Sequence, residues 1–254
     1  MKFKTMLPKL LLLTFCYLLT ANTFAQFNPK LTYGEVKDVE GNTYKTIQIG
    51  TQTWMAENLR TTKFNDSSLI PLVTDYAQWA KNDMDNLTLP MMCWYNNDKA
   101  TSTANKFGAL YNWFAINPST NGNKNVCPTG WHVPTDEEWN ALIANLDPSY
   151  DPMAEGIQSS TAGGKMKSTG TQYWLTPNTG AINSSGWSGL PGSHRFSNGE
   201  FKIVFSHFGR WWSSAGSEYD HGRAWGRYLF YGSGDVDRAA FLTDQGLSVR
   251  CLRD

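Results

Sequence analysis

Aromatic residues are spread along this chain, and small or polar residues separate them. The sequence has 11 Trp, 11 Tyr and 13 Phe, with Gly, Ser, Asn and Thr between the rings. This spacing favours short strands joined by long loops over a helical bundle, which needs long apolar stripes at helical spacing. A chain of this length suits one large domain or two small ones.

The first 25 residues have the pattern of a secretory signal peptide. Three lysines precede an apolar run over 10–19, and Ala25 ends a suitable cleavage site. A membrane-spanning helix would need about 20 apolar residues, and polar Thr20 ends the run too early. A lipid anchor on Cys16 is the other alternative, but the preceding Phe15 is bulky where lipoprotein processing takes a small residue. We expect cleavage near Ala25 and a secreted protein, periplasmic or extracellular.

The charge of the mature chain limits its partners. Removal of the signal takes away three lysines and leaves 19 basic against 22 acidic residues, without a long run of either sign. A nearly neutral chain without a basic patch argues against nucleic acid or an anionic membrane as partner. After cleavage we also expect no membrane-spanning segment.

Local patterns predict several secondary-structure elements. Thr135 as N-cap and Glu138 three residues later form a capping box, which predicts a helix over 135–146. A second helix is expected over 106–117, where apolar residues recur at helical spacing. Further predictions are a tail over 26–34, a hairpin turn at 40–43, an irregular region over 60–104 with a short helix near 76–81, a close-packing turn at 163–166, and strands over 201–205, 211–214, 223–231 and 247–252.

Three cysteines remain in the mature chain: Cys93, Cys127 and Cys251. An exported protein can form disulfides, and an odd number leaves one thiol unpaired. The three are far apart, without the C-x-x-C spacing of zinc ligands.

Seven short strings resemble, in this order, the Fibrobacter succinogenes major paralogous domain. They are QTWMAENL at 52–59, CWYNND at 93–98, GALYNW at 108–113, CPTGWHVPT at 127–135, GGKMK at 163–167, WWSS at 211–214 and SVRC at 248–251. The resemblance covers about residues 35–253, so we expect one such domain over 35–254.

The resemblance implies a C-type-lectin-like fold of the α+β class, with two helices, small twisted antiparallel sheets and long loops. It also implies a disulfide between Cys127 and Cys251. Such a bond would close a loop of more than 100 residues, worth about 4–5 kcal/mol on the loop-entropy account. Cys93 would then be a buried free thiol.

The family also looks related to the formylglycine-generating enzymes, and this sequence departs from their pattern. Those enzymes hold copper with a cysteine pair in the last third of the domain, where this chain has only Cys251. The Glu-Pro-Asn and Gln-Pro-Asp strings of calcium-dependent lectins are missing as well. None of the four histidines lies in a metal-ligand motif, which disfavours a metal-dependent oxidase.

Aromatic and basic residues gather in the C-terminal half and suggest a shallow carbohydrate site, because flat rings stack on sugar faces. The candidate glycan-binding residues are Trp187, Trp211, Trp225, Tyr228, Tyr231 and Arg223. The alternative is that these rings pack the core. Successive residues of a strand point to opposite faces, so we expect Trp212 to be buried and Trp211 to be partly exposed.

Asp235 and Asp237 alternate on the Gly-rich segment 232–237 and could hold calcium through oxygen ligands. The alternative is a solvated hairpin turn. No other cofactor is expected.

The function predicted first is a non-catalytic binding or adhesion module at or near the cell surface, with a polysaccharide or a surface protein as partner. The alternatives are an enzyme of the formylglycine-generating or metal-dependent oxidase type, and a structural surface protein without a ligand site.

Overall fold

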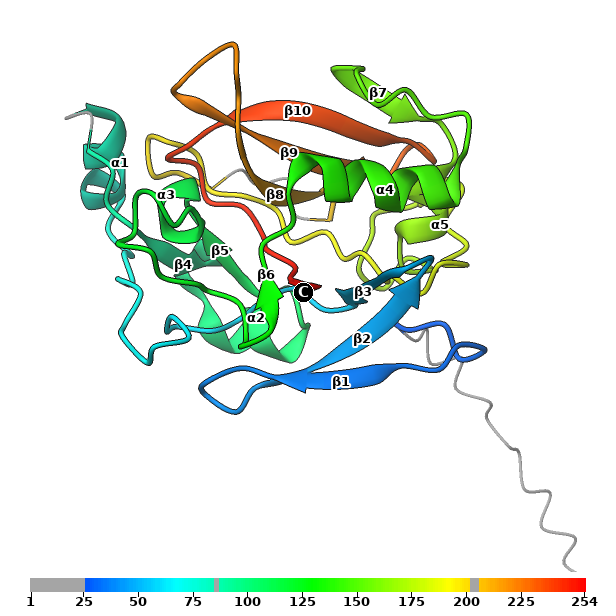
Figure 1. Cartoon of the computed structure of the whole chain (residues 1–254), viewed down its shortest axis with the longest axis horizontal. Helices are drawn as coiled ribbons and strands as arrows, with labels where there is room; N and C mark the ends of the chain where they lie inside the picture. Colours follow the sequence, from blue (N-terminus) through cyan, green and yellow to red (C-terminus); the bar gives the residue numbers. More distant parts are fainter. Residues whose placement is uncertain (1–25, 85–86, 202–205) are drawn as a thin grey trace, which may run out of the picture.

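The computed structural model describes residues 26–84, 87–201 and 206–254, and these form a mixed α+β fold (Figure 1). The predicted signal peptide lies outside the described residues, as does most of the strand expected over 201–205.

The described residues form three sheets in which neighbouring strands are antiparallel. The five-stranded sheet has the order β1 (Gly34–Lys37), β2 (Thr43–Ile49), β3 (Gln52–Met55), β11 (Leu252–Arg253) and β6 (Trp131–His132). The four-stranded sheet has the order β7 (Gly156–Ser159), β10 (Val236–Leu242), β9 (Arg223–Phe230) and β8 (Phe208–Gly216). A third sheet pairs β4 (Met92–Trp94) with β5 (Ala109–Tyr111).

The predicted hairpin is confirmed. β1 and β2 pair antiparallel with Lys37 opposite Thr43. The turn between them is held by Asp38, whose carboxylate accepts hydrogen bonds from the backbone N–H groups of Glu40 and Asn42.

Five α-helices occur among the described residues, more than the two that the family resemblance implies, and the short helix expected near 76–81 is one of them. They are α1 (Tyr76–Met84), α2 (Lys99–Ala104), α3 (Trp113–Ile116), α4 (Asp136–Leu146) and α5 (Ala162–Met166), with a 3₁₀ turn at Tyr95–Asn97. In α4 both bonds of the capping box form: Glu138 N–H donates to Thr135 Oγ1 at 3.2 Å, and Thr135 N–H donates to Glu138 Oε2 at 2.8 Å.

The helix predicted over 106–117 is wrong in its first half. Ala109–Tyr111 forms β5, and only Trp113–Ile116 is helical. Gly108 has a φ of +79°, which ends any helix before the strand begins. The strand is buried on both faces, so its apolar run could not be told from a helix by periodicity.

Tryptophan rings form the centre of the core. α4 lies between the four-stranded and the five-stranded sheets (Figure 1). Its Trp139 contacts Trp54 of β3 at 4.9 Å and Trp187 at 5.7 Å between ring centroids, and Trp187 contacts Trp211 of β8 at 4.7 Å. These contacts connect α4 with both sheets.

Two buried cations, Lys167 and Arg250, stabilise loops by donating hydrogen bonds to their backbone carbonyl oxygens. Lys167 is fully buried, and its Nζ donates to the carbonyl oxygens of Thr179, Phe230 and Ser233 at 2.6–2.9 Å. Arg250 is also fully buried and donates to the carbonyl oxygens of two further loop residues. Backbone carbonyls thus replace water around these charges, which keeps them tolerable in the interior.

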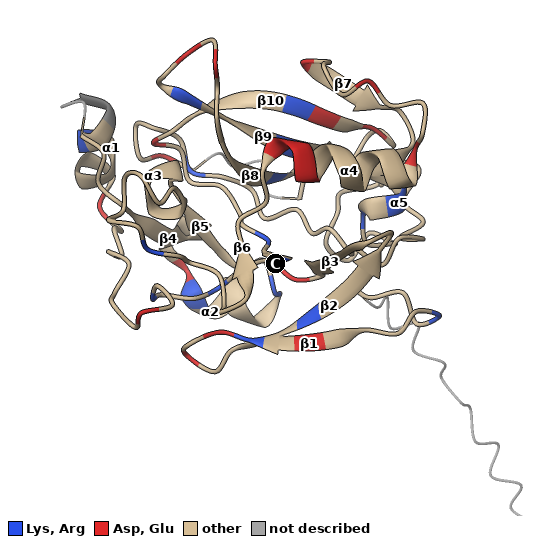
Figure 2. Cartoon of the chain, viewed as in Figure 1, with Lys and Arg blue, Asp and Glu red and all other residues tan. Residues whose placement is uncertain are grey.

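A buried ion-pair network ties α4 to the four-stranded sheet. Asp136, in the first turn of α4, accepts from Arg227 of β9 at 2.6 Å and from Arg238 of β10 at 2.9 Å. Figure 2 shows the acidic start of α4 beside the basic residues of this sheet.

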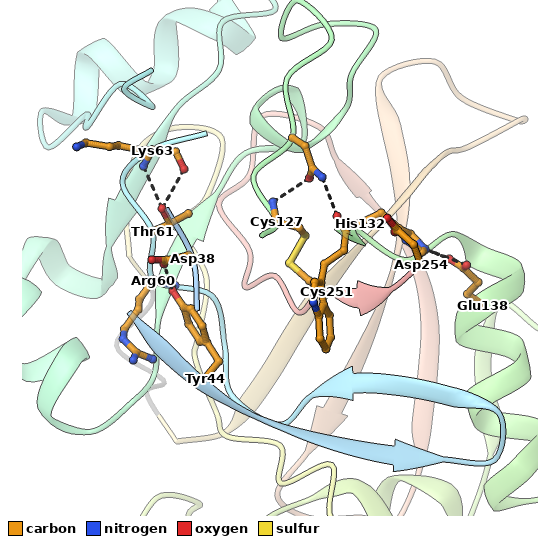
Figure 3. The surroundings of a disulfide bond; sticks show 12 residues. Asp38, Tyr44, Arg60, Thr61, Lys63, Cys127, His132, Glu138, Cys251 and Asp254 are labelled. Atoms are coloured by element: carbon orange, nitrogen blue, oxygen red, sulfur yellow. Dashed lines mark hydrogen bonds and ion pairs between the residues drawn. A yellow bond between two sulfur atoms is a disulfide. The ribbon is translucent and has the colours of Figure 1, made fainter. Parts of the chain in front are cut away.

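The disulfide between Cys127 and Cys251 is confirmed, and Cys93 is a buried free thiol. The bond joins the segment before β6 to the residue before β11 (Figure 3). Beside it, His132 lies between Asp254, at 2.6 Å, and Glu138, at 2.9 Å.

Within the described residues, no helix has the length and apolar character needed to cross a membrane.

Candidate functional site

The four-stranded sheet has one face against α4 and one face turned away from it. Arg227 of β9 bonds to Asp136 of α4, so its side chain lies on the inner face. Successive strand residues alternate between faces. Tyr228 and Phe230 therefore lie on the outer face, and both are partly exposed.

The strand register places further residues beside them. Phe208 of β8 is opposite Phe230, and Asp237 of β10 is opposite Tyr228. Ile157 of β7 is opposite Asp237 and is 56% exposed. Residues from all four strands, far apart in the sequence, thus meet on the outer face of the sheet.

These residues line an open pocket of about 260 Å³. Its lining residues are Ile157, Phe208, Tyr228, Phe230, Ser233, Asp235 and Asp237. Three aromatic rings and two carboxylates therefore share one small depression.

The three rings are fixed by contacts with one another. Phe208 stacks on Phe230 with ring centroids 4.9 Å apart and an interplanar angle of 28°, and it meets Tyr228 at 6.1 Å with a steep angle of 67°. Offset stacking and edge contacts are the favoured aromatic geometries, so the rings form a preformed surface.

Tyr228 and Asp237, which both line the pocket, are hydrogen-bonded to each other and affect each other's pKa. Burial raises the pKa of Asp237, nearby Asp235 raises it further, and a hydrogen bond from Tyr228 opposes the rise. Burial and the Asp237 charge raise the pKa of Tyr228 to about 12. At neutral pH the Tyr228 hydroxyl is therefore protonated and donates to the carboxylate of Asp237.

Residues 163–166, where a close-packing turn was predicted, belong to helix α5, and Gly163 packs against the backbone of the pocket residue Asp235. A Cβ on Gly163 would lie 1.8 Å from the carbonyl oxygen of Asp235, and one on Gly164 would lie 2.3 Å from that of Gly180. Only glycine fits at either position, and Gly163 fixes the loop that presents Asp235.

Three predicted glycan-binding tryptophans are not available to a ligand. Trp187 and Trp211 are fully buried and Trp225 is 2% exposed. The expectation that Trp211 is partly exposed is wrong, whereas Trp212 is buried as predicted. Both faces of β8 are covered here: Trp211 packs on Trp187, and Trp212 packs on Phe241 at 6.0 Å.

The remaining predicted residues divide between the pocket and other places. Tyr228 lines the pocket. Tyr231 packs against the core and meets His207 edge-on at 5.0 Å. Arg223 pairs with Asp220 at 3.1 Å, away from the pocket lining.

The calcium prediction for Asp235 and Asp237 gains no support from this geometry. Calcium takes six to eight oxygen ligands. Across the part of the chain that the structure describes, no group of three or more His, Cys, Asp or Glu side chains could hold a metal ion. The same two aspartates do come together, as acceptors in the pocket.

Sequence reasoning missed Phe208, Phe230, Ile157 and Ser233. A signal for Phe230 was present, because Tyr228 and Phe230 alternate within the strand predicted over 223–231. Phe208 was missed because the strand that contains it was expected to begin at Trp211 and in fact begins at Phe208.

Comparison with known proteins adds the family. Searches against curated proteins and against solved structures found no match. A family model, the Fibrobacter succinogenes major domain, matches residues 47–253. The match runs from β2 to the last strand and includes every residue of the pocket, so the chain belongs to the Fibrobacter succinogenes major domain family.

Proposed function

We propose that this protein is an exported, non-catalytic module that binds a glycan in the pocket on the outer face of the four-stranded sheet. The observation behind the proposal is the combination, in one pocket, of three partly exposed rings with the carboxylates of Asp235 and Asp237.

The chemistry of sugars fits such a surface. A pyranose has an apolar face of C–H groups, which packs on an aromatic ring, and a rim of hydroxyls, which donate to carboxylates. Tyr228, Phe208 and Phe230 supply the rings, and ionised carboxylates are strong acceptors. The small open pocket suits one sugar residue of a longer chain, with its neighbours lying over the adjacent surface.

Binding should be measured with a glycan array, followed by calorimetry with the soluble polysaccharides that score. We expect Tyr228→Ala and Asp237→Asn to abolish or strongly weaken binding. Tyr219→Ala is the matched control, because Tyr219 is 75% exposed and does not line the pocket. Melting curves establish that each variant is folded.

A blank array with folded protein would refute the glycan proposal. If the folded protein binds no glycan but binds a purified cell-surface protein, the protein-binding alternative is supported. Loss of that binding in Tyr228→Ala would assign it to the same pocket.

Export and the finer fold class belong to the same proposal. We propose cleavage near Ala25. The lysines and the apolar run within residues 1–25 support this. Mass spectrometry of the protein from its native host would test it, with Gln26 as the expected first residue. We also propose a C-type-lectin-like fold, supported by the small antiparallel sheets, the long loops and the pairing of β3 with β11. Superposition of an experimental structure on C-type lectins would test it.

A further inference from the structure

Arg210 lies beside the pocket, on the same face of the sheet. It is directly opposite Tyr228 in the β8–β9 register, and Tyr228 is in turn opposite Asp237 on β10. Its guanidinium carbon lies 4.9 Å from the ring centroid of Phe208 and 5.7 Å from that of Phe241. Arg210, Tyr228 and Asp237 therefore form a row across three strands.

No residue of the described ranges hydrogen-bonds to the Arg210 side chain or pairs with it. Its Nε is buried without a partner, whereas its terminal nitrogens, also unbonded, are not buried. The other buried cations differ: Arg227 has Asp136 and Asn140, and Lys167 has three carbonyl oxygens.

A half-buried cation that lacks a hydrogen-bonded or oppositely charged partner is unfavourable, and ring contacts leave its N–H groups without acceptors. Burial lowers the pKa of Arg210 to about 10, and the electrostatic influence of Tyr228 opposes this fall. The guanidinium is still charged at neutral pH, so an anion placed against its terminal nitrogens would gain a charge-assisted hydrogen bond where none exists now.

We propose that the pocket selects an acidic sugar residue, with the sugar carboxylate on Arg210 and its hydroxyls on Asp237 and Asp235. This inference rests on the glycan-binding function proposed above. Neighbouring strands are about 4.8 Å apart, so Arg210 and Asp237 are separated by about 10 Å across Tyr228. A single uronate residue lying over the Tyr228 ring can direct its carboxylate to one end of the row and its hydroxyls to the other.

A carboxylate is favoured over a sulfate ester as the anion. The planar guanidinium matches the planar carboxylate with two parallel hydrogen bonds. The opposite end of the row is acidic, which repels a second negative charge and restricts the ligand to one acidic group per bound residue.

The test is calorimetric titration with three matched oligosaccharides: a galacturonate trimer, a neutral galactose trimer and a sulfated galactose trimer. We expect the galacturonate trimer to bind best and to lose affinity with added salt. Arg210→Met should weaken its binding about tenfold or more, because a hydrogen bond between charged groups is lost. Arg253→Met removes an exposed arginine outside the pocket and should leave binding unchanged.

Thermal melting separates a ligand-binding role for Arg210 from a structural one. Since Arg210 makes no polar contact with the described residues, Arg210→Met without ligand should melt at the same temperature as the wild type or higher. A clearly lower melting temperature would indicate a structural role and overturn the inference.

The outcomes distinguish the two proposals. Equal binding of the neutral and acidic trimers, unaffected by Arg210→Met, would overturn this inference and leave the glycan function standing. Preference for the sulfated trimer would overturn the assignment of a carboxylate. Absence of binding to every glycan by the folded protein would refute the function and this inference together.

Discussion

Replacement of Asp136 by Asn is expected to destabilise the protein strongly, because this residue is the buried counter-ion at the start of α4. Asp136 is 7% exposed and is the carboxylate between two buried arginines, Arg227 and Arg238. Asn keeps the size of the side chain and one acceptor oxygen but removes the charge. Both guanidinium groups would then be left in the interior without a counter-ion.

The expected magnitude follows from the burial of all three side chains. Breaking a buried ion pair by removing one partner costs about 3–5 kcal/mol of unfolding free energy. A domain of this size loses about 2–4 °C of melting temperature per kcal/mol, which gives a fall of roughly 6–20 °C. Guanidinium chloride unfolding followed by tryptophan fluorescence measures the free energy, and calorimetry measures the melting temperature.

Glu137→Gln is the control, because Glu137 is the exposed neighbour of Asp136 in the same turn. If Asp136→Asn changes the unfolding free energy by no more than about 1 kcal/mol beyond this control, the reasoning is wrong. A double-mutant cycle with Arg227→Met adds a second test, since the double variant should lose clearly less than the sum of the two single losses.

Three further predictions concern other parts of the fold. Replacing Cys127 and Cys251 together by Ala should lower the unfolding free energy by about 5 kcal/mol on the loop-entropy account, since 124 residues separate them; unfolding curves in the absence of reductant test this, and an unchanged midpoint would contradict it. For His132, burial on its own lowers the pKa, but hydrogen bonds and attraction from Asp254 and Glu138 outweigh it and raise the pKa overall. The resulting stabilisation is fully present below the unfolded pKa of about 6.5 and is lost as the pH rises through the folded pKa, so His132→Gln should cost more stability near pH 5.5 than near pH 8.5; equal costs at both would refute this sign. Gly163→Ala should cost about 1–3 kcal/mol and weaken glycan binding, because the new methyl group would displace the carbonyl of Asp235; normal stability together with normal binding would show that this loop does not position the site.

Local signals predicted those elements whose causes are local. The capping box of α4 and the turn around Asp38 depend on hydrogen bonds between residues a few positions apart. The helix predicted over 106–117 failed because its first half is decided by pairing with β4. Long-range pairing overrides local periodicity when a segment is buried on all sides.

The exposure of Trp211 could not be predicted from the sequence. The alternation of side chains along a strand shows only that Trp211 and Trp212 point to opposite faces of the sheet. The rule gives one buried ring and one exposed ring only when one face of the sheet is open to solvent. At Trp211 and Trp212 both faces of β8 are covered, by Trp187 on one side and by Phe241 on the other.

The pocket was only partly predictable for a related reason. Tyr228, Asp235 and Asp237 are close in the sequence, and all three were singled out. Phe208 and Ile157 join them only through the register of β8 and β7 with their neighbours, which the sequence pattern does not specify.

The position of β11 between β3 and β6 has a consequence for the order of folding. Leu252 pairs with Trp54 on one side and with His132 on the other, so the five-stranded sheet closes only when β11, which follows β3 and β6 in the chain, pairs with both of them. Contacts between such distant residues slow folding, because a long loop must close before they form. Until that moment β3 and β6 each have an unpaired edge, and such edges readily pair with other chains. The newly made protein is therefore most prone to aggregation in the interval just before β11 inserts, and substitutions that weaken this strand should reduce the yield of folded protein more than they reduce its stability once folded.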